Sequence, residues 1–517
     1  MRAWIVIALL VVLVAAAGGA WYGLEVYPQQ QFRAGLAEAL ATLPPGTTAT
    51  YKTAHYSPLS RQAVVTGWQM HGEIPLSPPL PFDITLDSIE MEAPNLDFAG
   101  SWARALAAPA ALAPDTPLPV AVAVTVKGLT VRSAIVNLTE DTAHVTNPRL
   151  YPWALLHDGM PSWTDLLATL TPRPGPPDLG DLRVVLRTEA AAVLGVAWDS
   201  HAAKAVKFTE TLPGVDIEYD VHEMTGGAFD RGIARGANAE GITYNARTHV
   251  GFSIDRVAMG EIDMRQPMTK LINGEALSPA MLDGIRIGRI EYHGVTALVP
   301  GQPPIHVGAV SLGPVAFAQG LPVSGELGWT DFSVSKTQLP DPRAREAFDQ
   351  LGLDTMTISF ALAYNWDTAR QRVSVHDTML RINELGTVTI AADFGDIVAN
   401  AAVLTSAKLV HARARFEDAS LVDRMLRAGA TQTGTDVAEY RRQVATLARQ
   451  QGITGNDAGP ALRAAGAAAG DFVTSPHSLT IELTPPAPVP LSALMATGAD
   501  PANSAAMLGL AVTANQP

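Results

Sequence analysis

One short stretch of the chain resembles a catalytic motif. Ser333-Val334-Ser335-Lys336 matches the SxxK pattern of serine acyl-enzymes, in which the serine is the nucleophile. That chemistry needs the serine at the start of a helix and two companion motifs, whereas Phe332 and Val334 alternate with polar residues as in a strand. We therefore interpret the match as coincidental.

The histidines and acidic residues show no spacing typical of a metal site or a hydrolase. The 12 histidines include no HExxH motif, and the adjacent His222 and Glu223 should point to opposite faces of a strand. Asp87, Glu90 and Glu92 alternate with apolar residues, which is typical of a solvated strand face. Walker, GxGxxG and GxSxG motifs are also absent from the sequence. We predict no catalytic, cofactor-binding or metal-binding residues and no enzymatic activity, and an enzyme assembled from distant residues is our last hypothesis.

Composition excludes further classes of protein. The sequence has no cysteine, which excludes disulfides, catalytic thiols and a lipid-modified N-terminal cysteine. The net charge of -14 argues against nucleic acid as a partner. With 47% hydrophobic and 17% charged residues in 517, the chain is expected to form an anchored soluble body.

The first residues have the composition of a membrane-spanning helix. No charged side chain occurs from Ala3 to Leu24, and Ile5 to Ala17 is almost entirely Ile, Leu, Val and Ala. Trp4 and Trp21 would lie about 26 Å apart along a helix, close to the separation of two interfacial aromatic belts. We predict a transmembrane anchor at residues 3–24.

The charges that flank this segment predict its orientation. Arg2 precedes the segment and Glu25 follows it, so residues 1–2 should lie in the cytoplasm and the body in the periplasm, at the bacterial inner membrane. Cleavage of a signal peptide at Gly18-Gly19-Ala20 is the alternative, and it places the body in the same compartment.

After the anchor, residues 25–46 are expected to form a juxtamembrane helix and residues 47–417 an extended β-rich body. Within the body, the pattern φ-x-φ-x-x-φ-x-φ recurs, where φ is apolar, for example at Ile84, Leu86, Ile89 and Met91. Side chains alternate between the two faces of a strand. In this pattern the apolar residues move from even to odd positions, or the reverse, and each such change of parity requires an irregularity such as a β-bulge to keep them on one face. Glycines that could relieve crowding lie near these changes of parity: Gly128, Gly260, Gly294 and Gly313. The sequence thus predicts a mainly β (α+β) fold with curved, bulged antiparallel sheets, and its cleanest meander lies between Met356 and Phe394.

Short helices interrupt the predicted strands, and residues 418–517 are expected to hold a helical hairpin and a terminal strand. The hairpin should begin at Ser420 and turn near Gly434, with Asp436 and Glu439 as a capping box. Other helical patterns cover residues 101–112, 153–170, 268–282 and 342–351, residues 450–470 read as a loose linker or a weak helix, and residues 478–483 read as a strand.

An N-terminal helix, a long body of repeated φ-x-φ units and a helical section near the C-terminus resemble the AsmA-like and YdgA-like proteins of the bacterial envelope. The resemblance implies a sheet folded into a groove and a role in lipid handling or outer-membrane homeostasis. The partners expected are the cytoplasmic membrane, through residues 3–24, and a lipid or another envelope protein. The alternative is a protein-binding scaffold or assembly factor. An open trough lined by residues such as Ile287, Val307 and Val310 would favour lipid, and a closed core would favour the scaffold.

Overall fold

The computed structural model describes residues 46–156, 179–275, 278–397, 407–451 and 459–516, apart from 59, 75–79, 96, 134–135, 213–214, 247–250 and 497–500. In the preceding segment it describes Gln29, Phe32, Arg33, Leu36 and Leu40, all helical. The anchor predicted at residues 3–24, with residues 1–2, lies outside the described residues. Among the helices that are described, none combines the length and apolar character needed to cross a membrane.

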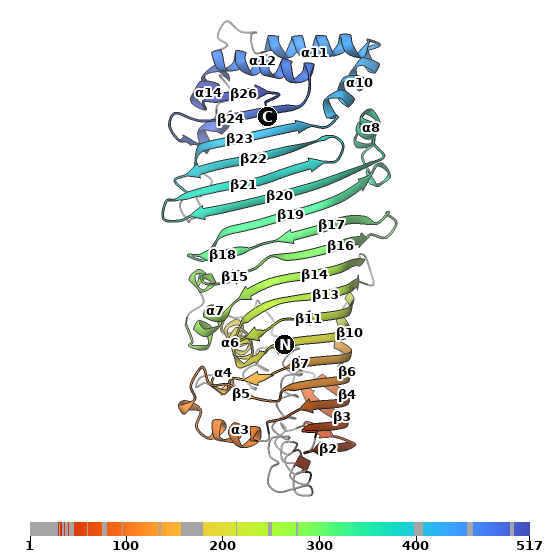
Figure 1. The fold of residues 1–517 in the computed structure, drawn as a ribbon, viewed down its shortest axis with the longest axis vertical. Helices are drawn as coiled ribbons and strands as arrows, with labels where there is room; N and C mark the ends of the chain where they lie inside the picture. Colours follow the sequence, from red (N-terminus) through yellow and green to blue (C-terminus); the bar gives the residue numbers. More distant parts are fainter. Residues whose placement is uncertain are drawn as a thin grey trace. The chain divides into compact units, whose positions relative to one another are not determined.

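The chain divides into two compact units, residues 1–288 (unit 1) and 289–517 (unit 2). Each consists mainly of antiparallel strands that lie side by side, as Figure 1 shows. The prediction of a mainly β fold with a curved antiparallel sheet is confirmed.

Unit 1 is a meander of long strands with short strands at its margins. Its long strands pair antiparallel in the order β3, β4, β6, β7, β10, β11, β13, β14. The long strands are β3 (Gln62–Ile74), β4 (Leu80–Glu92), β6 (Ala123–Ser133), β7 (Val136–Thr146), β10 (Ser200–Leu212), β11 (Val215–Gly226), β13 (Ile233–Ala246) and β14 (Gly251–Asp263). The short strands are β1 (Thr48–Thr50), β2 (Thr53–Ser57), β5 (Leu118–Pro119), β8 (Arg149–Leu150), β9 (Val196–Trp198), β12 (Phe229–Asp230) and β15 (Arg286–Ile287). The helices are α3 (Phe98–Ala107), α4 (Pro152–Leu156), α6 (Leu179–Gly195) and α7 (Arg265–Ile272), with 3₁₀ turns at Pro109–Ala111 and Pro279–Leu282.

The main core of unit 1 lies on one face of β2, β3, β4 and β6, which we call the core face. Trp68 is fully buried there, and Phe32 and Leu36 of the preceding helical segment pack in the same cluster. A smaller core joins α4, α6 and α7 through Ala190, Leu194 and other apolar side chains. The core therefore covers only the first strands of the meander.

The predicted changes of parity are real, but in unit 1 they do not require an extra residue. Leu86 and Ile89 are both buried on the core face although three positions separate them. Thr85 pairs with Thr130 and Ser88 pairs with Lys127, so the register of β4 and β6 is the same on both sides of the switch. Both strands of a pair change parity together, and the bulge expected here is absent from this described pair.

The positions at which parity changes, which we call the parity switches, lie opposite one another from strand to strand across unit 1. Every second long strand has a residue with positive φ at its switch. These residues are Gly67, Gly128, Ala205 and Gly241. The register places Asp87, Asp141, His222 and Asp255 opposite them on the intervening strands. A Cβ at Gly128 would lie 2.2 Å from the Asp87 carboxylate, so only glycine fits there. Gly128, Gly294 and Gly313 have positive φ, but Gly260 does not: the residue with positive φ is its partner in β13, Gly236.

Unit 2 is a second meander, and here register shifts typical of bulges do occur, for example between β20 and β21. The strands are β16 (Ile290–Leu298), β17 (Ile305–Leu312), β18 (Val315–Ala318), β19 (Leu321–Ser335), β20 (Thr355–Asp367), β21 (Arg372–Ile382), β22 (Gly386–Gly395), β23 (Lys408–Asp418), β24 (Ser478–Leu483), β25 (Val489–Pro490) and β26 (Leu510–Ala514). The helices are α8 (Pro342–Leu351), α10 (Leu421–Thr433), α11 (Val437–Gln451), α12 (Pro460–Thr474), α13 (Leu491–Ala496) and α14 (Pro501–Met507), with a 3₁₀ turn at Lys336–Gln338. The predicted meander is confirmed as β20, β21 and β22.

The predicted helical hairpin is also present. α10 ends at Thr433, and Gly434, which has φ of +66°, caps it. Asp436 accepts hydrogen bonds from the backbone N–H groups of Ala438 and Glu439, whereas the Glu439 carboxylate pairs with Arg442 and does not complete the capping box. Part of the expected linker at residues 450–470 belongs to α12, which packs on α11.

Candidate functional site

The strongest candidate for a functional surface is one face of the unit 2 sheet, which we call the apolar face. Residues directly opposite each other in an antiparallel pair share a face. One unbroken row of such partners crosses the sheet from β16 to β26: Tyr292, Val310, Trp329, Phe360, Leu380, Val388, Phe416, Leu479 and Ala514. Every member of the row is apolar or aromatic, and the rings of Trp329 and Phe360 stack with centroids 4.5 Å apart.

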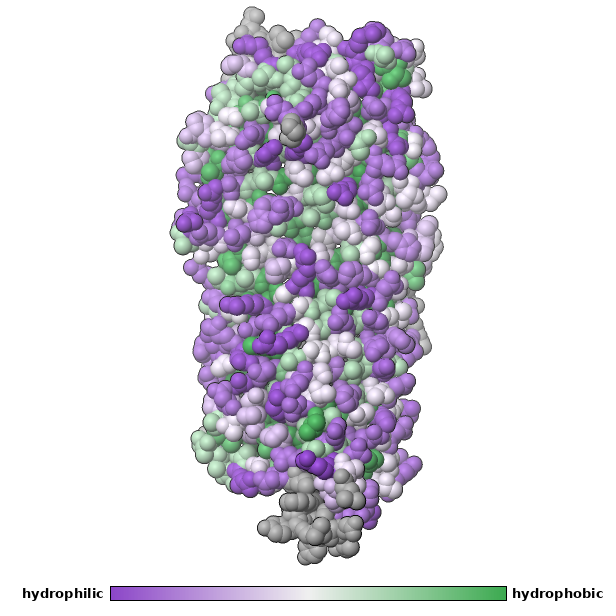
Figure 2. Space-filling model, viewed as in Figure 1, coloured by the Kyte–Doolittle hydropathy of each residue, from purple (hydrophilic) through white to green (hydrophobic). Residues whose placement is uncertain are grey.

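Large apolar side chains on this face remain exposed to solvent. The exposed fractions are 40% for Leu312, 37% for Leu327, 40% for Leu380, 43% for Ile390 and 40% for Ile481. Val307 and Val310, expected to line a trough, lie on the same face and are partly exposed. Near the C-terminus, Phe472 of α12 packs edge-on against Phe416 and covers part of the row. In Figure 2, hydrophobic residues appear among hydrophilic ones at the surface.

The opposite face of the same strands is polar. On that face Ser359, Arg381 and Thr387 are register partners across β20, β21 and β22. Two residues further along β22, Thr389 is the partner of Arg415 in β23, which is the partner of Thr480 in β24. Ion pairs lie on this face, including Arg372 with Asp393 at 2.7 Å and His411 with Glu482 at 3.2 Å. The sheet is thus amphipathic, and exposed apolar area of this kind marks an interaction surface in soluble proteins.

In unit 1, the core face continues past the packed core as an open apolar surface. Among the long strands, β7 is the last that packs against the core cluster, through Leu138 and Ala143. Beyond them the rings of Phe208, Tyr219, Tyr244 and Phe252 follow one another across β10, β11, β13 and β14, with centroids 6.0, 4.9 and 4.5 Å apart. Tyr219 is exposed, and the other three rings are partly exposed.

The carboxyl group of Glu140 interrupts this apolar surface. Glu140 of β7 lies opposite Leu129 of β6, and on its other side the register places it opposite Val206 of β10. Burial of the carboxyl by its surroundings raises the pKa of Glu140 above its ordinary value. No hydrogen bond or ion pair of Glu140 is found within the described part of the chain.

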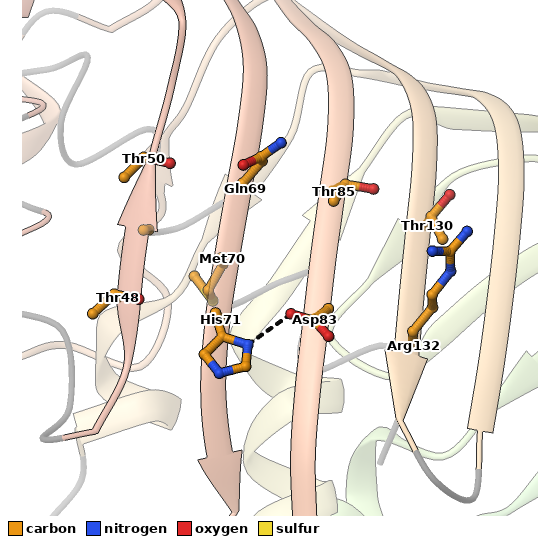
Figure 3. Close-up of a pocket in the computed structure, with 10 residues that line it drawn as sticks. Thr48, Thr50, Gln69, Met70, His71, Asp83, Thr85, Thr130 and Arg132 are labelled. Carbon is orange, nitrogen blue, oxygen red and sulfur yellow. Dashed lines mark hydrogen bonds and ion pairs between the residues drawn. The ribbon is translucent and has the colours of Figure 1, made fainter.

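A separate polar depression of about 430 Å³ lies among the first strands of unit 1 (Figure 3). His71 Nδ1 and Asp83 Oδ1 are 2.6 Å apart within it, and Arg132 lies opposite Asp83 in the neighbouring strand. His71 and Asp83 are about 60% exposed, with fractions of 62% and 58%. Exposed ion pairs of this kind contribute about 0–1 kcal/mol, and the depression offers no nucleophile bonded to His71. We assign no function to it.

The motifs considered at first fall in different strands and contribute to neither apolar surface. Ser333 and Ser335 belong to β19 and Lys336 pairs with Asp349, so the SxxK match lies at the end of a strand, as interpreted. Val221 and Met224 of β11 both face the open surface, so a parity switch lies between them. His222 and Glu223 therefore share the opposite face, and the expectation that they point to opposite faces is wrong. Glu90 pairs with Lys127 at 2.6 Å. Within the described ranges, no group of three His, Asp or Glu side chains could hold a metal ion.

Sequence alternation marks the two faces of each strand, but it missed Glu140. The signal was available in the pattern: residues 136–140 alternate Val, Leu and Glu on one face, with Glu where the repeat would have an apolar residue. Without the strand register, however, Glu140 reads as an ordinary surface carboxylate.

Comparison with known proteins gives one match. A family model described as "Uncharacterized protein" matches residues 379–515, which extend from β21 to the end of β26. No curated protein and no solved structure matches the chain. The resemblance to the AsmA-like and YdgA-like proteins stays a prediction.

Proposed function

We propose that the chain is a non-enzymatic, membrane-anchored protein of the bacterial envelope, with its body in the periplasm, and that its apolar face holds lipid acyl chains. The observation that carries the proposal is the exposure of Leu312, Leu327, Leu380, Ile390 and Ile481 on one face of unit 2. Exposing such side chains to water costs roughly 25 cal/mol per Å² of apolar area, and a bound acyl chain recovers that free energy.

The shape of the surface supports an extended apolar ligand. Adjacent strands are about 4.8 Å apart, so a row that crosses many strands offers a long apolar path rather than a small pocket. Its members come from every long strand of unit 2, and the row of Trp329, Phe360 and their described partners contains no Asp, Glu, His, Lys or Arg. An acyl chain has no polar atoms to satisfy and fits such a path.

Photo-crosslinking of the full chain in its membrane tests the proposal. A benzoylphenylalanine at Ile390 should yield lipid adducts, which mass spectrometry of the isolated protein would identify. The matched control is the same residue at Thr389, which is also exposed but points to the polar face. Lipid adducts at both positions, or at neither, would refute the proposal.

A protein-binding scaffold is the second candidate, and one observation favours it. Met425 on α10 and Leu447 on α11 are 59% and 54% exposed, which gives the helical hairpin an apolar surface of its own. Protein adducts at Ile390 in place of lipid would support the scaffold on the sheet. Loss of a copurifying protein on the double change Met425→Ser and Leu447→Ser would place it on the hairpin.

A further inference from the structure

The core face of unit 1 combines an apolar path with the carboxyl group of Glu140 at one end. The row Glu140, Val206, Val221, Ile242 and Ile254 crosses β7, β10, β11, β13 and β14. The aromatic row of Phe208, Tyr219, Tyr244 and Phe252 runs beside it. From β7 to β14 the path is roughly 19 Å long, compared with about 15 Å for half of the hydrocarbon layer of a bilayer. One acyl chain can therefore lie across these strands with its polar end at Glu140.

The charges on this surface select the polar end of the ligand. At the paired positions of β7 to β14 that face the same way, the only Asp, Glu, His, Lys or Arg side chains are Glu140, Glu210 and His201, and none is lysine or arginine. The basic residues of these strands, such as Lys204 and Lys207, lie on the other face, where they pair with Glu223 and Glu218. An anionic head group would meet no positive charge here.

Glu140 itself lacks the partner that a half-buried carboxylate needs. It lies between Leu129 and Val206, and no hydrogen bond or ion pair reaches it from the described residues. A carboxylate that loses water without gaining a partner destabilises the fold, and a ligand cation can supply that partner.

We propose that the core face of unit 1 binds a lipid whose head group contains an ammonium ion, and that Glu140 accepts its hydrogen bond. This inference rests on the proposed function, because it names the class of lipid and a second surface that holds it. Val206, Val221 and the aromatic row contact the acyl chain, and the ammonium group lies at the β7 end.

The test uses the full chain in vesicles with equal amounts of phosphatidylethanolamine and phosphatidylglycerol with identical acyl chains. A benzoylphenylalanine at Val206, opposite Glu140, reports by mass spectrometry which head group is captured. A charge-assisted hydrogen bond is worth about ten-fold in binding, so the ethanolamine lipid should be enriched about ten-fold in the adducts. Glu140→Gln should bring the ratio close to one. Asp141→Asn, which removes the same charge at the exposed neighbouring residue, should leave the enrichment unchanged.

Equal capture of the two lipids by the unsubstituted chain, or enrichment that persists in Glu140→Gln, would overturn the inference. Lipid adducts at Ile390 with none at Val206 would overturn it and leave the proposed function intact. Absence of lipid adducts at both positions would refute the proposed function as well.

Discussion

Trp329 and Phe360 stack across β19 and β20 with their ring centroids 4.5 Å apart, on a face where neighbouring leucines are exposed to water. The indole Nε1 of Trp329 is buried without a hydrogen-bond partner in the described structure. The pair therefore combines favourable ring packing with an unsatisfied donor.

These two effects can be separated by substitution at position 329. Trp329→Phe keeps a stacked ring and removes the donor, so its free energy of unfolding should stay within about 1 kcal/mol of the unsubstituted chain or exceed it. Trp329→Ala loses the ring and should be less stable than Trp329→Phe by at least about 1 kcal/mol. Urea unfolding followed by circular dichroism measures both, and equal stability of the two variants would show that the stack contributes nothing.

A charge on the apolar face should abolish lipid binding on that face without unfolding the protein. Ile390 is already 43% exposed, so Ile390→Glu should lower the free energy of unfolding by no more than about 1 kcal/mol. Bound lipid, extracted from the purified chain and quantified by mass spectrometry, should fall to the amount that unit 1 holds. Thr389→Glu adds the same charge on the polar face and should retain the lipid; equal loss in both variants would point to a general effect of charge.

The stability of the chain should depend on pH through Glu140. Burial raises the pKa of this carboxyl in the folded protein above its ordinary value of 4.5, so the folded state holds the proton more tightly than the unfolded chain. The resulting stabilisation is fully present below the pKa of the unfolded chain and is lost as the pH rises through the folded pKa. Glu140→Gln should therefore raise the melting temperature at pH 7 and lose this advantage below about pH 4.5. Thermal unfolding at both pH values checks the sign, with Asp141→Asn as the matched control.

A parity switch should accept only glycine at its positive-φ position where a side chain of the neighbouring strand lies close to that position. Gly128→Ala requires φ near +63° and brings the new Cβ against Asp87, so the free energy of unfolding should fall by more than about 2 kcal/mol. Gly434→Ala has a similar φ of +66° with open space around it and should cost only about 1 kcal/mol. If the two variants were equally stable, backbone conformation alone would explain the requirement for glycine at position 128.

Local features of this fold were predictable because short-range physics determines them. The alternation at residues 356–394, the helix at 342–351 and the strand at 478–483 correspond to β20–β22, α8 and β24. The helix expected at residues 268–282 was only partly correct: α7 ends at Ile272, before Gly274 with φ of +78°, and a 3₁₀ turn follows at Pro279. The helix expected at 153–170 appears as α4 up to Leu156, and its remainder lies outside the described residues.

The candidate surfaces were less predictable because they depend on which residues distant in the sequence pair with a strand or cover its face. Alternation at Leu380 and Ile390 shows that two faces differ, but it does not show whether another element covers the apolar one. The composition of β7 likewise does not show that Glu140 lies between Leu129 and Val206. Both facts follow from strand register and coverage, which emerge only when the whole meander is assembled.

The synchronised switches at Gly67, Gly128, Ala205 and Gly241 also determine how such a sheet can evolve. A strand pair that changes parity together leaves the register of its neighbours untouched, so the pair is a self-contained segment that gene duplication can copy. Inserting or deleting such a pair would lengthen or shorten the apolar path by about 10 Å without disturbing the flanking strands. Loss of one residue within a single strand would instead put its side chains on the wrong face up to the next turn. Relatives of this chain should therefore differ in length by whole strand pairs.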